Sequence, residues 1–410
     1  MPDAGVLIVG ASQAGAQLAF SLREFGATCP ITLVGAEEHL PYQRPPLSKA
    51  YLSGKAEASS LLLRSADYYA EQGIDVVTGE WIERIDLGAA GGRATSATGR
   101  TFDFDQLALT VGGTPRRLPV PGADLRNVFY LRDLSDAAAL RASLDDARRV
   151  VVVGGGFVGL EAAAVTNNLG KEVVVVEALD RLMARVVAPV VSQFYLEAHE
   201  RRGVRVLLDT GVVGLSGSGT VSSVELSDGT SLPADIVLVG IGLVAHTGLA
   251  EQLGLEVSSG GIVIDAHART SLPEVVAAGD CTALRSDGGL LRIESVANAI
   301  AQGRAAAATL AGVHDPLSVV PWFWSDQGDI KLQIAGLSSG YDDVVLRGEP
   351  DSQQFSALYY REDRLIAIDS INTPRDYMAV RKILEGGASV PRTVAADLGV
   401  QLKTHIPLRS

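Results

Sequence analysis

Residues 149–159 read RVVVVGGGFVG, an apolar run that leads directly into a glycine-rich turn. The run carries no polar alternation, which is typical of a strand buried in a parallel sheet. The turn has the spacing GxGxxG, in which the glycines permit a tight turn, a close approach of backbone to a pyrophosphate, and close packing of helix on strand. A helix expected over 160–169 and a strand expected over 173–176 would complete a βαβ unit.

Glu177 ends the second strand of this unit, where a carboxylate is expected to bind the adenosine ribose. Such a carboxylate favours NADH over NADPH, because it repels a 2′-phosphate. The alternative is a solvated acid at a strand end, and Arg181 and Arg185 just beyond it would assist a phosphate. The residues expected to bind NAD are Gly154, Gly156, Phe157, Val158, Gly159, Glu161, Glu177, Arg185 and Gly242.

The opening of the chain repeats this pattern with one departure. A strand expected over Val6–Val9 meets GASQAG at 10–15, where Ser12 replaces the middle glycine, and a second strand is expected over Ile31–Val34. Taken alone, this loop is equally compatible with an ordinary strand-to-helix turn built from small residues. Glu37 is the candidate ribose ligand of this unit, and its two neighbours are the alternatives.

Two dinucleotide units in one chain indicate a bound flavin and an exchangeable nicotinamide nucleotide, so we expect FAD and NADH as cofactors. The predicted fold class is α/β, with two Rossmann-like dinucleotide-binding domains. A C-terminal α+β domain is expected to follow, because aromatic residues and alternating patterns gather after Pro321. The expected ranges are 1–115 and 245–320 for the FAD-binding domain, 116–244 for the NAD-binding domain, and 321–410 for the C-terminal domain.

The composition sets limits on partners and location. A net charge of −13 over 410 residues argues against a nucleic-acid binder and against docking on an anionic membrane. The chain shows no signal peptide and no uncharged apolar run of about 18 residues, so we expect a soluble cytoplasmic protein. The six histidines and two cysteines lack metal-ligand or CxxC spacing, so no metal site is expected.

Five motifs, in order along nearly the whole chain, resemble those of one family. The stretch PYQRPPLSK at 41–49 is similar to the PYxRPPLSK signature of oxygenase-coupled, NADH-dependent ferredoxin reductases. The same family is matched by GGGFVGLE at 154–161, AAGDC at 277–281, RIESV at 292–296 and PWFWSDQ at 321–327. The resemblance implies a glutathione-reductase-like fold, in which the NAD domain interrupts the FAD domain and a C-terminal domain follows.

The resemblance also implies an activity: electrons pass from NADH through FAD to a 2Fe–2S ferredoxin that supplies a cytochrome P450 or a Rieske-type oxygenase. In the resembled fold, Lys49 and Glu161 come from different nucleotide domains and meet beside flavin N5. Glu161 would position the nicotinamide and Lys49 would balance charge as hydride arrives, with an exposed helix residue as the alternative for Glu161. The residues expected to bind FAD are Gly10, Ser12, Ala14, Gly15, Glu37, Arg44, Pro45, Lys49, Ile82, Arg132, Gly279, Asp280, Val296 and Trp324.

Some expected flavin contacts carry an alternative or a departure from the family pattern. Asp280 would accept hydrogen bonds from ribitol hydroxyls, and a helix N-cap is its alternative. A helix beginning near Ser295 would point its positive end at the flavin. Trp324 is expected near the flavin and the acceptor surface, with interface packing as the alternative. The departures are Ser12, Ala36, Thr110-Val111-Gly112, Val244-Ala245-His246 and Gly328.

The position of cysteine separates the candidate reactions. Disulfide reductases of this fold carry a redox-active cysteine pair after the first βαβ unit, where this chain has PYQRPPLSK. Cys281 is a single thiol, expected as buried packing, so electrons would pass directly from the flavin to an outside acceptor. One alternative is an NADH oxidase or peroxidase, which often uses one cysteine beside the flavin. Another is a redox-dependent interaction protein resembling apoptosis-inducing factor, against which the charge of −13 counts.

Overall fold

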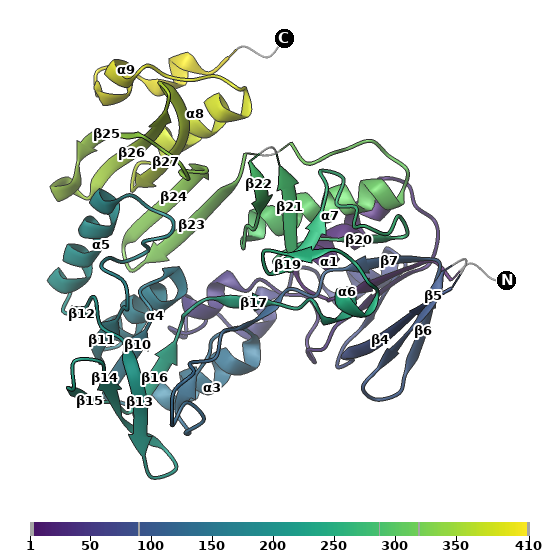
Figure 1. Ribbon diagram of the computed structural model, residues 1–410, viewed down its shortest axis with the longest axis horizontal. Coiled ribbons are helices and arrows are strands. Elements are labelled where there is room, and N and C mark those ends of the chain that lie inside the picture. The colour runs from purple at the N-terminus through teal and green to yellow at the C-terminus, as the bar shows by residue number, and fades with distance from the viewer. Residues whose placement is uncertain (1–3, 89–90, 287, 319, 408–410) are drawn as a thin grey trace. The chain divides into compact units, whose positions relative to one another are not determined.

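The computed structural model describes residues 4–88, 91–286, 288–318 and 320–407 (Figure 1). The chain divides into two compact units, each assembled from three separate stretches of sequence. The first unit contains Met1–Gln43, Ala58–Thr114 and Leu243–Val319, and the second contains Arg44–Glu57, Pro115–Gly242 and Val320–Ser410. The three domains expected from the sequence stay a prediction, and the ends of their ranges, 1–3 and 408–410, lie outside the described residues.

The core of the first unit is a parallel sheet with the strand order β20-β7-β1-β2-β3. Its strands are β1 (Val6–Val9), β2 (Ile31–Val34), β3 (Ile74–Val77), β7 (Gln106–Leu109) and β20 (Val275–Ala277). The chain leaves β1 through helix α1 (Gln13–Glu24) and returns as β2 on one side, while β7 pairs on the other. The carboxyl end of β1 is therefore a topological switch point, where open parallel sheets bind ligands.

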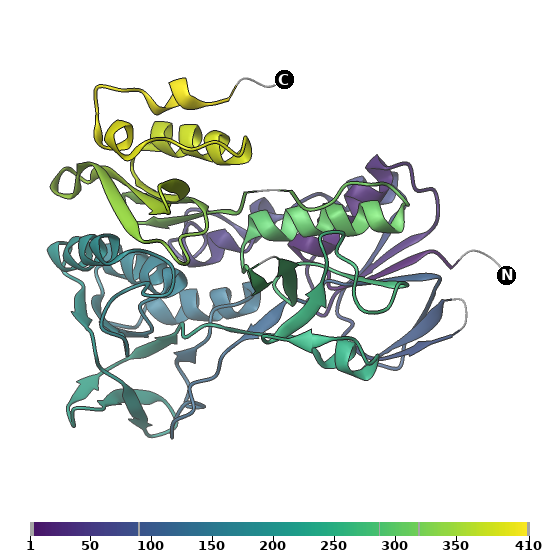
Figure 2. The same ribbon diagram turned by 45° about the horizontal axis from the view of Figure 1, so that its top comes forward.

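Helix α7 (Val296–Leu310) lies beside α1 in the first unit (Figure 2). Glycine makes this approach possible, because a Cβ on Gly303 would lie 2.7 Å from the carbonyl oxygen of Ala14. An antiparallel sheet β4-β5-β6 and a four-stranded sheet β18-β19-β21-β22 complete the unit. The bounds are η2 (Ala58–Leu61), α2 (Ala66–Glu71), β4 (Ile82–Leu87), β5 (Gly92–Ser96), β6 (Thr101–Phe104), α6 (Gly248–Gln252), β18 (Val257–Ser258), β19 (Gly261–Ile264), β21 (Thr282–Ser286) and β22 (Gly289–Leu291). Where the chain crosses between units it forms β8 (Gly113–Pro115) and β17 (Leu243–Ala245).

The second unit holds a second parallel sheet, with the order β12-β11-β10-β16-β9, and a small antiparallel sheet β13-β14-β15. The bounds are β9 (Val128–Phe129), α3 (Leu134–Leu144), β10 (Arg149–Val153), α4 (Phe157–Asn168), β11 (Glu172–Val176), α5 (Pro189–Arg201), β12 (Arg205–Leu207), β13 (Val212–Gly217), β14 (Val221–Leu226), β15 (Ser231–Pro233) and β16 (Ile236–Val239). Helix α4 begins at Phe157 rather than at the expected residue 160, because Gly156 is already its N-cap. The third glycine of the motif therefore lies inside the first helical turn.

The last part of the second unit is an antiparallel sheet with the order β23-β24-β27-β26-β25, covered on one face by α8 (Figure 2). The bounds are η1 (Pro45–Ser48), β23 (Trp322–Gln327), β24 (Ile330–Gly336), β25 (Asp343–Glu349), η3 (Pro350–Ser352), β26 (Gln354–Arg361), β27 (Arg364–Ile371), α8 (Pro374–Glu385), α9 (Arg392–Ala396) and η4 (Leu402–His405). One hydrophobic cluster, which includes Leu52, Val150, Phe194 and Phe355, joins this sheet to the parallel sheet. The predicted fold class is confirmed, and the stretch with alternating patterns after Pro321 forms antiparallel strands.

Candidate active site

The glycine-rich turn before α4 has the geometry of a phosphate cradle. Gly154 has a φ of +106°, and a Cβ there would lie 2.5 Å from the carbonyl oxygen of Gly240. A Cβ on Gly159 would lie 2.3 Å from the carbonyl oxygen of Gly154, whereas the nearest neighbour of a Cβ on Gly156 is 4.0 Å away. Backbone packing thus requires the first and third glycines. The second leaves open space at the positive end of the helix, which suits a pyrophosphate.

Glu177 is fixed against this turn. Its Oε2 accepts a 2.6 Å hydrogen bond from the backbone N–H of Gly155, and its Oε1 accepts a 2.8 Å bond from that of Leu179. Each carboxylate oxygen retains lone-pair capacity that a ribose hydroxyl would use. The loop, Glu177 and Gly242 all follow the carboxyl ends of neighbouring strands, so the expected NAD residues share one edge of this sheet.

Three further expected NAD residues lie around the same edge. Val158 is 45% exposed in the first turn of α4, and Phe157 beside it packs on Phe323 with ring centroids 4.6 Å apart. Arg185 is exposed, and its Nη2 lies 3.8 Å from the position of a Cβ on Gly242, whose φ is +107°. These residues fit a nicotinamide dinucleotide laid across the turn.

The first glycine loop has the same backbone requirements. Gly10 has a φ of +116°, and a Cβ there would lie 2.2 Å from the carbonyl oxygen of Thr110. A Cβ on Gly15 would lie 2.1 Å from the carbonyl oxygen of Gly10. Ser12 is the N-cap residue of α1, with extended backbone. The uncharged first turn of α1 leaves its positive end available to a phosphate, so this loop fits the second dinucleotide.

Five other expected FAD residues belong to the first unit: Ala14, Gly279, Asp280, Val296 and Ile82. A Cβ on Gly279 would lie 3.0 Å from Ala14 Cβ, so AAGDC meets the start of α1. Asp280 is half-buried and precedes strand β21, so the N-cap alternative for it is wrong. Val296 opens α7, whose N-cap is Ser295, as expected. The remaining member, Ile82, is buried in the core at the start of β4.

Glu37 is held by a tyrosine from the following segment. The hydroxyl of Tyr42 donates a hydrogen bond to Glu37 Oε2, and Glu37 is half-buried whereas Ala36 and Glu38 are exposed. Of the three neighbouring positions considered from the sequence, the side chain of Glu37 is therefore the one with a fixed orientation. This supports Glu37 as the candidate ribose ligand of the first unit.

Lys49, which is half-buried, forms an ion pair with the buried Glu161 inside the second unit. Lys49 Nζ lies 2.6 Å from Glu161 Oε2, and the side chain of Glu161 is only 4% exposed. Ser48 Oγ donates to the same oxygen at 2.6 Å, and Ser325 Oγ donates to Glu161 Oε1 at 2.6 Å. The alternative of an exposed helix residue at 161 is wrong. Removing one partner of such a buried pair typically costs about 3–5 kcal/mol, because the other charge is left without compensation.

The segment that carries Lys49 also holds two expected FAD residues. Arg44 precedes η1, and its Nη1 donates a 2.8 Å hydrogen bond to the carbonyl oxygen of Arg132. Pro45 begins η1, and its carbonyl oxygen lies 3.3 Å from Lys49 Nζ. Although Lys49 and Glu161 were expected from different nucleotide domains, both belong to the second compact unit, because 44–57 packs there.

Four residues around Glu161 were missed as site residues. Ser48 and Ser325 hold the carboxylate, and Gln327 Nε2 donates to Ser325 Oγ at 3.3 Å. Gln327 Oε1 lies 2.8 Å from His199 Nε2. The motifs PPLSK and WSDQ contain three of these four residues, so the signal was present in the sequence. His199 has no motif and is placed only by the packing of α5.

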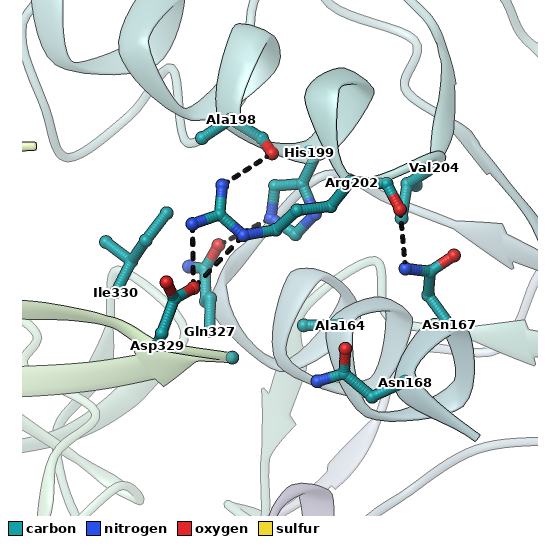
Figure 3. Close-up of a pocket in the computed structure, with 11 residues that line it drawn as sticks. Ala164, Asn167, Asn168, Ala198, His199, Arg202, Val204, Gln327, Asp329 and Ile330 are labelled. Carbon is teal, nitrogen blue, oxygen red and sulfur yellow. Dashed lines mark hydrogen bonds and ion pairs between the residues drawn. The ribbon is translucent and has the colours of Figure 1, made fainter. Parts of the chain in front are cut away.

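His199 lines a small cavity in the second unit (Figure 3). The cavity has a volume of about 30 Å³, and its lining includes Asn167, Asn168, Arg202 and Asp329. Burial lowers the pKa of His199; its hydrogen bond to Gln327 opposes that shift, and the charge of Arg202 adds to it. The imidazole is therefore held in its neutral form.

Trp324 is the residue expected near the acceptor surface, and Cys281 is the thiol expected as buried packing. Trp324 is half-buried on β23 and stacks on Trp322 with ring centroids 5.6 Å apart. Cys281 is fully buried, and burial raises the pKa of its thiol to about 11. A thiol that stays protonated is unsuited to nucleophilic redox chemistry, so its packing role is favoured.

The described residues offer neither a metal-binding cluster nor a membrane-spanning helix. Within the described ranges, the histidine, cysteine and carboxylate side chains form no group of three placed to hold a metal ion. None of the helices in the described part of the chain has the length and apolar character needed to span a bilayer.

The sequence matches two family models that together cover most of the chain. Residues 4–303 match the pyridine nucleotide-disulphide oxidoreductase model, and residues 322–406 match the reductase C-terminal model. Rhodocoxin reductase of Rhodococcus erythropolis is 43% identical over 404 residues, which cover 98% of this chain and 94% of that protein.

Two further comparisons are with ferredoxin reductases. The 5,5′-dehydrodivanillate O-demethylase ferredoxin reductase subunit of Sphingobium is 40% identical over 408 residues, covering 98% of each chain. The crystal structure of the ferredoxin reductase for the CYP199A2 system of Rhodopseudomonas palustris is similar to this one with a TM-score of 0.95. It is 41% identical in sequence, and the match covers 99% of this chain and 100% of that one.

Proposed function

Because this chain belongs to the pyridine nucleotide-disulphide oxidoreductase family, we propose that it passes electrons from NADH through FAD to a 2Fe–2S ferredoxin that supplies a cytochrome P450 or a Rieske-type oxygenase. Family membership confirms the predicted fold class and the predicted class of cofactors. The similar ferredoxin reductases support the choice of acceptor.

One observation carries the proposal: the side chain that meets Glu161 is a lysine. Lys49 lies in the segment where disulfide reductases of this fold carry their redox-active cysteine pair, and it forms a 2.6 Å ion pair with Glu161. This site therefore offers charge and hydrogen bonds rather than a disulfide. An outside acceptor is then required, because the buried Cys281 cannot relay electrons as a thiolate.

FAD, when bound, supplies the conversion of a two-electron hydride into single electrons. We propose that Glu161 positions the nicotinamide, since three donors hold its carboxylate in one orientation. Lys49 would keep the local charge balanced, and its ammonium is restrained by the carbonyl oxygen of Pro45. Gly10, Ser12 and the other expected FAD residues would hold the flavin dinucleotide.

We propose NADH rather than NADPH as the donor because Glu177 occupies the ribose position beside the glycine loop. Its carboxylate is fixed by two backbone N–H groups, so it cannot swing away from an incoming 2′-phosphate without losing both bonds. Arg185, which lies beside Gly242, would also contact the nucleotide. A cytoplasmic location stays a prediction that cell fractionation would test.

The test compares acceptors on the purified protein. NADH-dependent reduction of cytochrome c is measured without added carrier, with a 2Fe–2S ferredoxin, and with a one-iron rubredoxin as a matched control. We expect the ferredoxin to accelerate reduction at least tenfold over the other two conditions. Carrier-independent NADH consumption with matching oxygen uptake would instead identify an oxidase, and no NADH consumption with any acceptor would overturn the proposed function.

A further inference from the structure

A chain of buried side chains links His199 to Glu161 inside the second unit. It runs from His199 on α5 to Gln327 and Ser325 on β23, and ends at Glu161 on α4. The successive heavy-atom distances are 2.8, 3.3 and 2.6 Å. All four residues are at most 3% exposed, so water does not compete for these bonds.

The hydrogens along this chain all point the same way. The amide nitrogen of Gln327 donates to Ser325 Oγ and lies 3.9 Å from the sulfur of Met183. Its Oε1 therefore faces His199, and an amide oxygen can only accept, so the imidazole must donate from Nε2. At the other end, the Glu161 carboxylate can only accept. The single hydroxyl hydrogen of Ser325 is thus directed to Glu161, and the neutral His199 is the Nε2–H tautomer.

A small polar cavity adjoins His199. A neutral Nε2–H imidazole leaves Nδ1 as an acceptor. The cavity volume of about 30 Å³ exceeds what one water molecule needs, and its lining is polar. Figure 3 shows the amides of Asn167 and Asn168 and the Arg202–Asp329 ion pair around it. The cavity is therefore large enough and polar enough to hold one water molecule.

We propose that His199 is a positioning residue for Glu161, acting through Gln327 and Ser325. Its Nε2–H fixes the Gln327 amide, the amide directs the Ser325 hydroxyl, and the hydroxyl holds Glu161 Oε1. The other carboxylate oxygen is held by Lys49 and Ser48. The orientation of Glu161 by this series of hydrogen bonds rests on the observed contacts alone. The effect of that orientation on the reaction with NADH rests on the proposed function.

The proposal fixes what happens when the imidazole is lost. In His199→Leu the Gln327 amide can turn over and present Oε1 to Ser325, which draws the hydroxyl hydrogen away from Glu161. The carboxylate then keeps its two donors on Oε2 and loses the restraint on Oε1. We expect reduction of the bound flavin by NADH to slow about tenfold, the order of one lost hydrogen bond to a charged group. In His199→Gln a side-chain N–H can still donate, so the rate should recover.

The first measurement reads the tautomer directly. Protein labelled with ¹⁵N-histidine is examined by long-range proton–nitrogen NMR at neutral pH, with His199→Gln used to assign the His199 signals. We expect a protonated Nε2 and an unprotonated Nδ1, and loss of this preference in Gln327→Leu. A Nδ1–H tautomer in the unsubstituted protein would overturn the proposal, whether or not the protein reacts with NADH.

The second measurement tests whether His199 acts through Ser325. Stopped-flow reduction is compared for His199→Leu, Ser325→Ala and the double variant, each checked for FAD content. Action through Ser325 predicts that the double variant reacts at the rate of Ser325→Ala alone, whereas independent structural damage predicts multiplied losses and would overturn the proposal. Asp329→Asn is the matched control, because Asp329 lines the cavity but takes no part in the hydrogen bonds from His199 to Glu161. This variant should react like the unsubstituted protein. If that protein itself is not reduced by NADH, the proposed function fails, and the tautomer measurement still decides the geometric part.

Discussion

The carboxylate of Asp369 should make the second unit less stable as the pH rises. Asp369 lies on β27 and is 1% exposed. The hydroxyl of Tyr359 donates to its Oδ2, while within the described residues Oδ1 has no hydrogen-bond donor. Burial raises the pKa of Asp369 from 3.8 to about 7, and the bond from Tyr359 only partly offsets this effect. The carboxylic acid is therefore favoured in the folded protein well above the pH at which an unfolded chain would lose the proton.

The size of the effect follows from that difference. A rise of about 3 pKa units corresponds to about 4 kcal/mol, since each unit is worth about 1.36 kcal/mol. The folded-state pKa is raised, so the stabilisation is fully present below the unfolded pKa of 3.8 and is lost as the pH rises through about 7. About 2 kcal/mol of the loss falls between pH 5 and pH 7. Asp369→Asn removes the titrating proton and keeps an oxygen that can accept from Tyr359.

The assay is urea unfolding of the two proteins at pH 5, 6, 7 and 8, followed by tryptophan fluorescence. Two of the three tryptophans, Trp322 and Trp324, lie on β23 of the same sheet and report on this unit. We expect the free energy of unfolding of the unsubstituted protein, relative to the variant, to fall by about 2 kcal/mol between pH 5 and pH 7. The exposed Asp351→Asn is the control and should show no such trend. A difference between Asp369→Asn and the unsubstituted protein that does not vary with pH would refute the reasoning.

Four further predictions concern the cofactors and the acceptor. The purified protein should be yellow, with about one FAD per chain, and a folded preparation that takes up no FAD would contradict both glycine-loop assignments. Glu177→Gln should reduce the ratio of kcat/KM for NADH to kcat/KM for NADPH about tenfold, because a neutral amide no longer repels the 2′-phosphate. If the unsubstituted protein has the same kcat/KM for both nucleotides, Glu177 does not select NADH. Glu161→Gln should slow stopped-flow flavin reduction at least tenfold while FAD stays bound, since the residue is expected to position the nicotinamide; an unchanged rate would exclude it. We expect the acceptor ferredoxin to be acidic, so a chain of charge −13 would need a local basic patch to attract it. Added salt should then slow the reaction with ferredoxin and leave the reaction with ferricyanide nearly unchanged; parallel responses would rule out such a patch.

The parts of the fold that local patterns govern were predictable from the sequence. Both βαβ units, the strand ends at 9 and 153 and the antiparallel strands near the C-terminus follow from apolar periodicity and glycine spacing. The start of α4 was placed too late, because the expected helix began after the motif whereas Gly156 already caps it. Local patterns did not show which distant segments pack together in one unit. Nothing in the pattern of 44–57 shows that it packs with 115–242 and 320–410.

The candidate site likewise contains residues that local spacing predicts and residues that only long-range packing brings together. The glycine loops and Glu177 could be predicted from spacing, because each acts within one supersecondary unit. The meeting of Lys49 with Glu161 came only from the family resemblance, since no local rule relates positions so far apart. The tie from His199 through Gln327 to Ser325 was missed because it depends on how α5 packs against β23, which no motif encodes.

The three-part assembly of the second unit also bears on how the chain is made. A ribosome releases Lys49 early, Glu161 later and Ser325 later still, yet all three must be present before the carboxylate is fully held. Until β23 emerges, Glu161 must remain hydrated, and the apolar surface that α4 and α5 later share with Ile330 and Phe355 stays uncovered. Such late, non-local closure leaves nascent chains open to aggregation. The end of synthesis, rather than the appearance of the glycine loop, sets the moment at which this unit can complete its core.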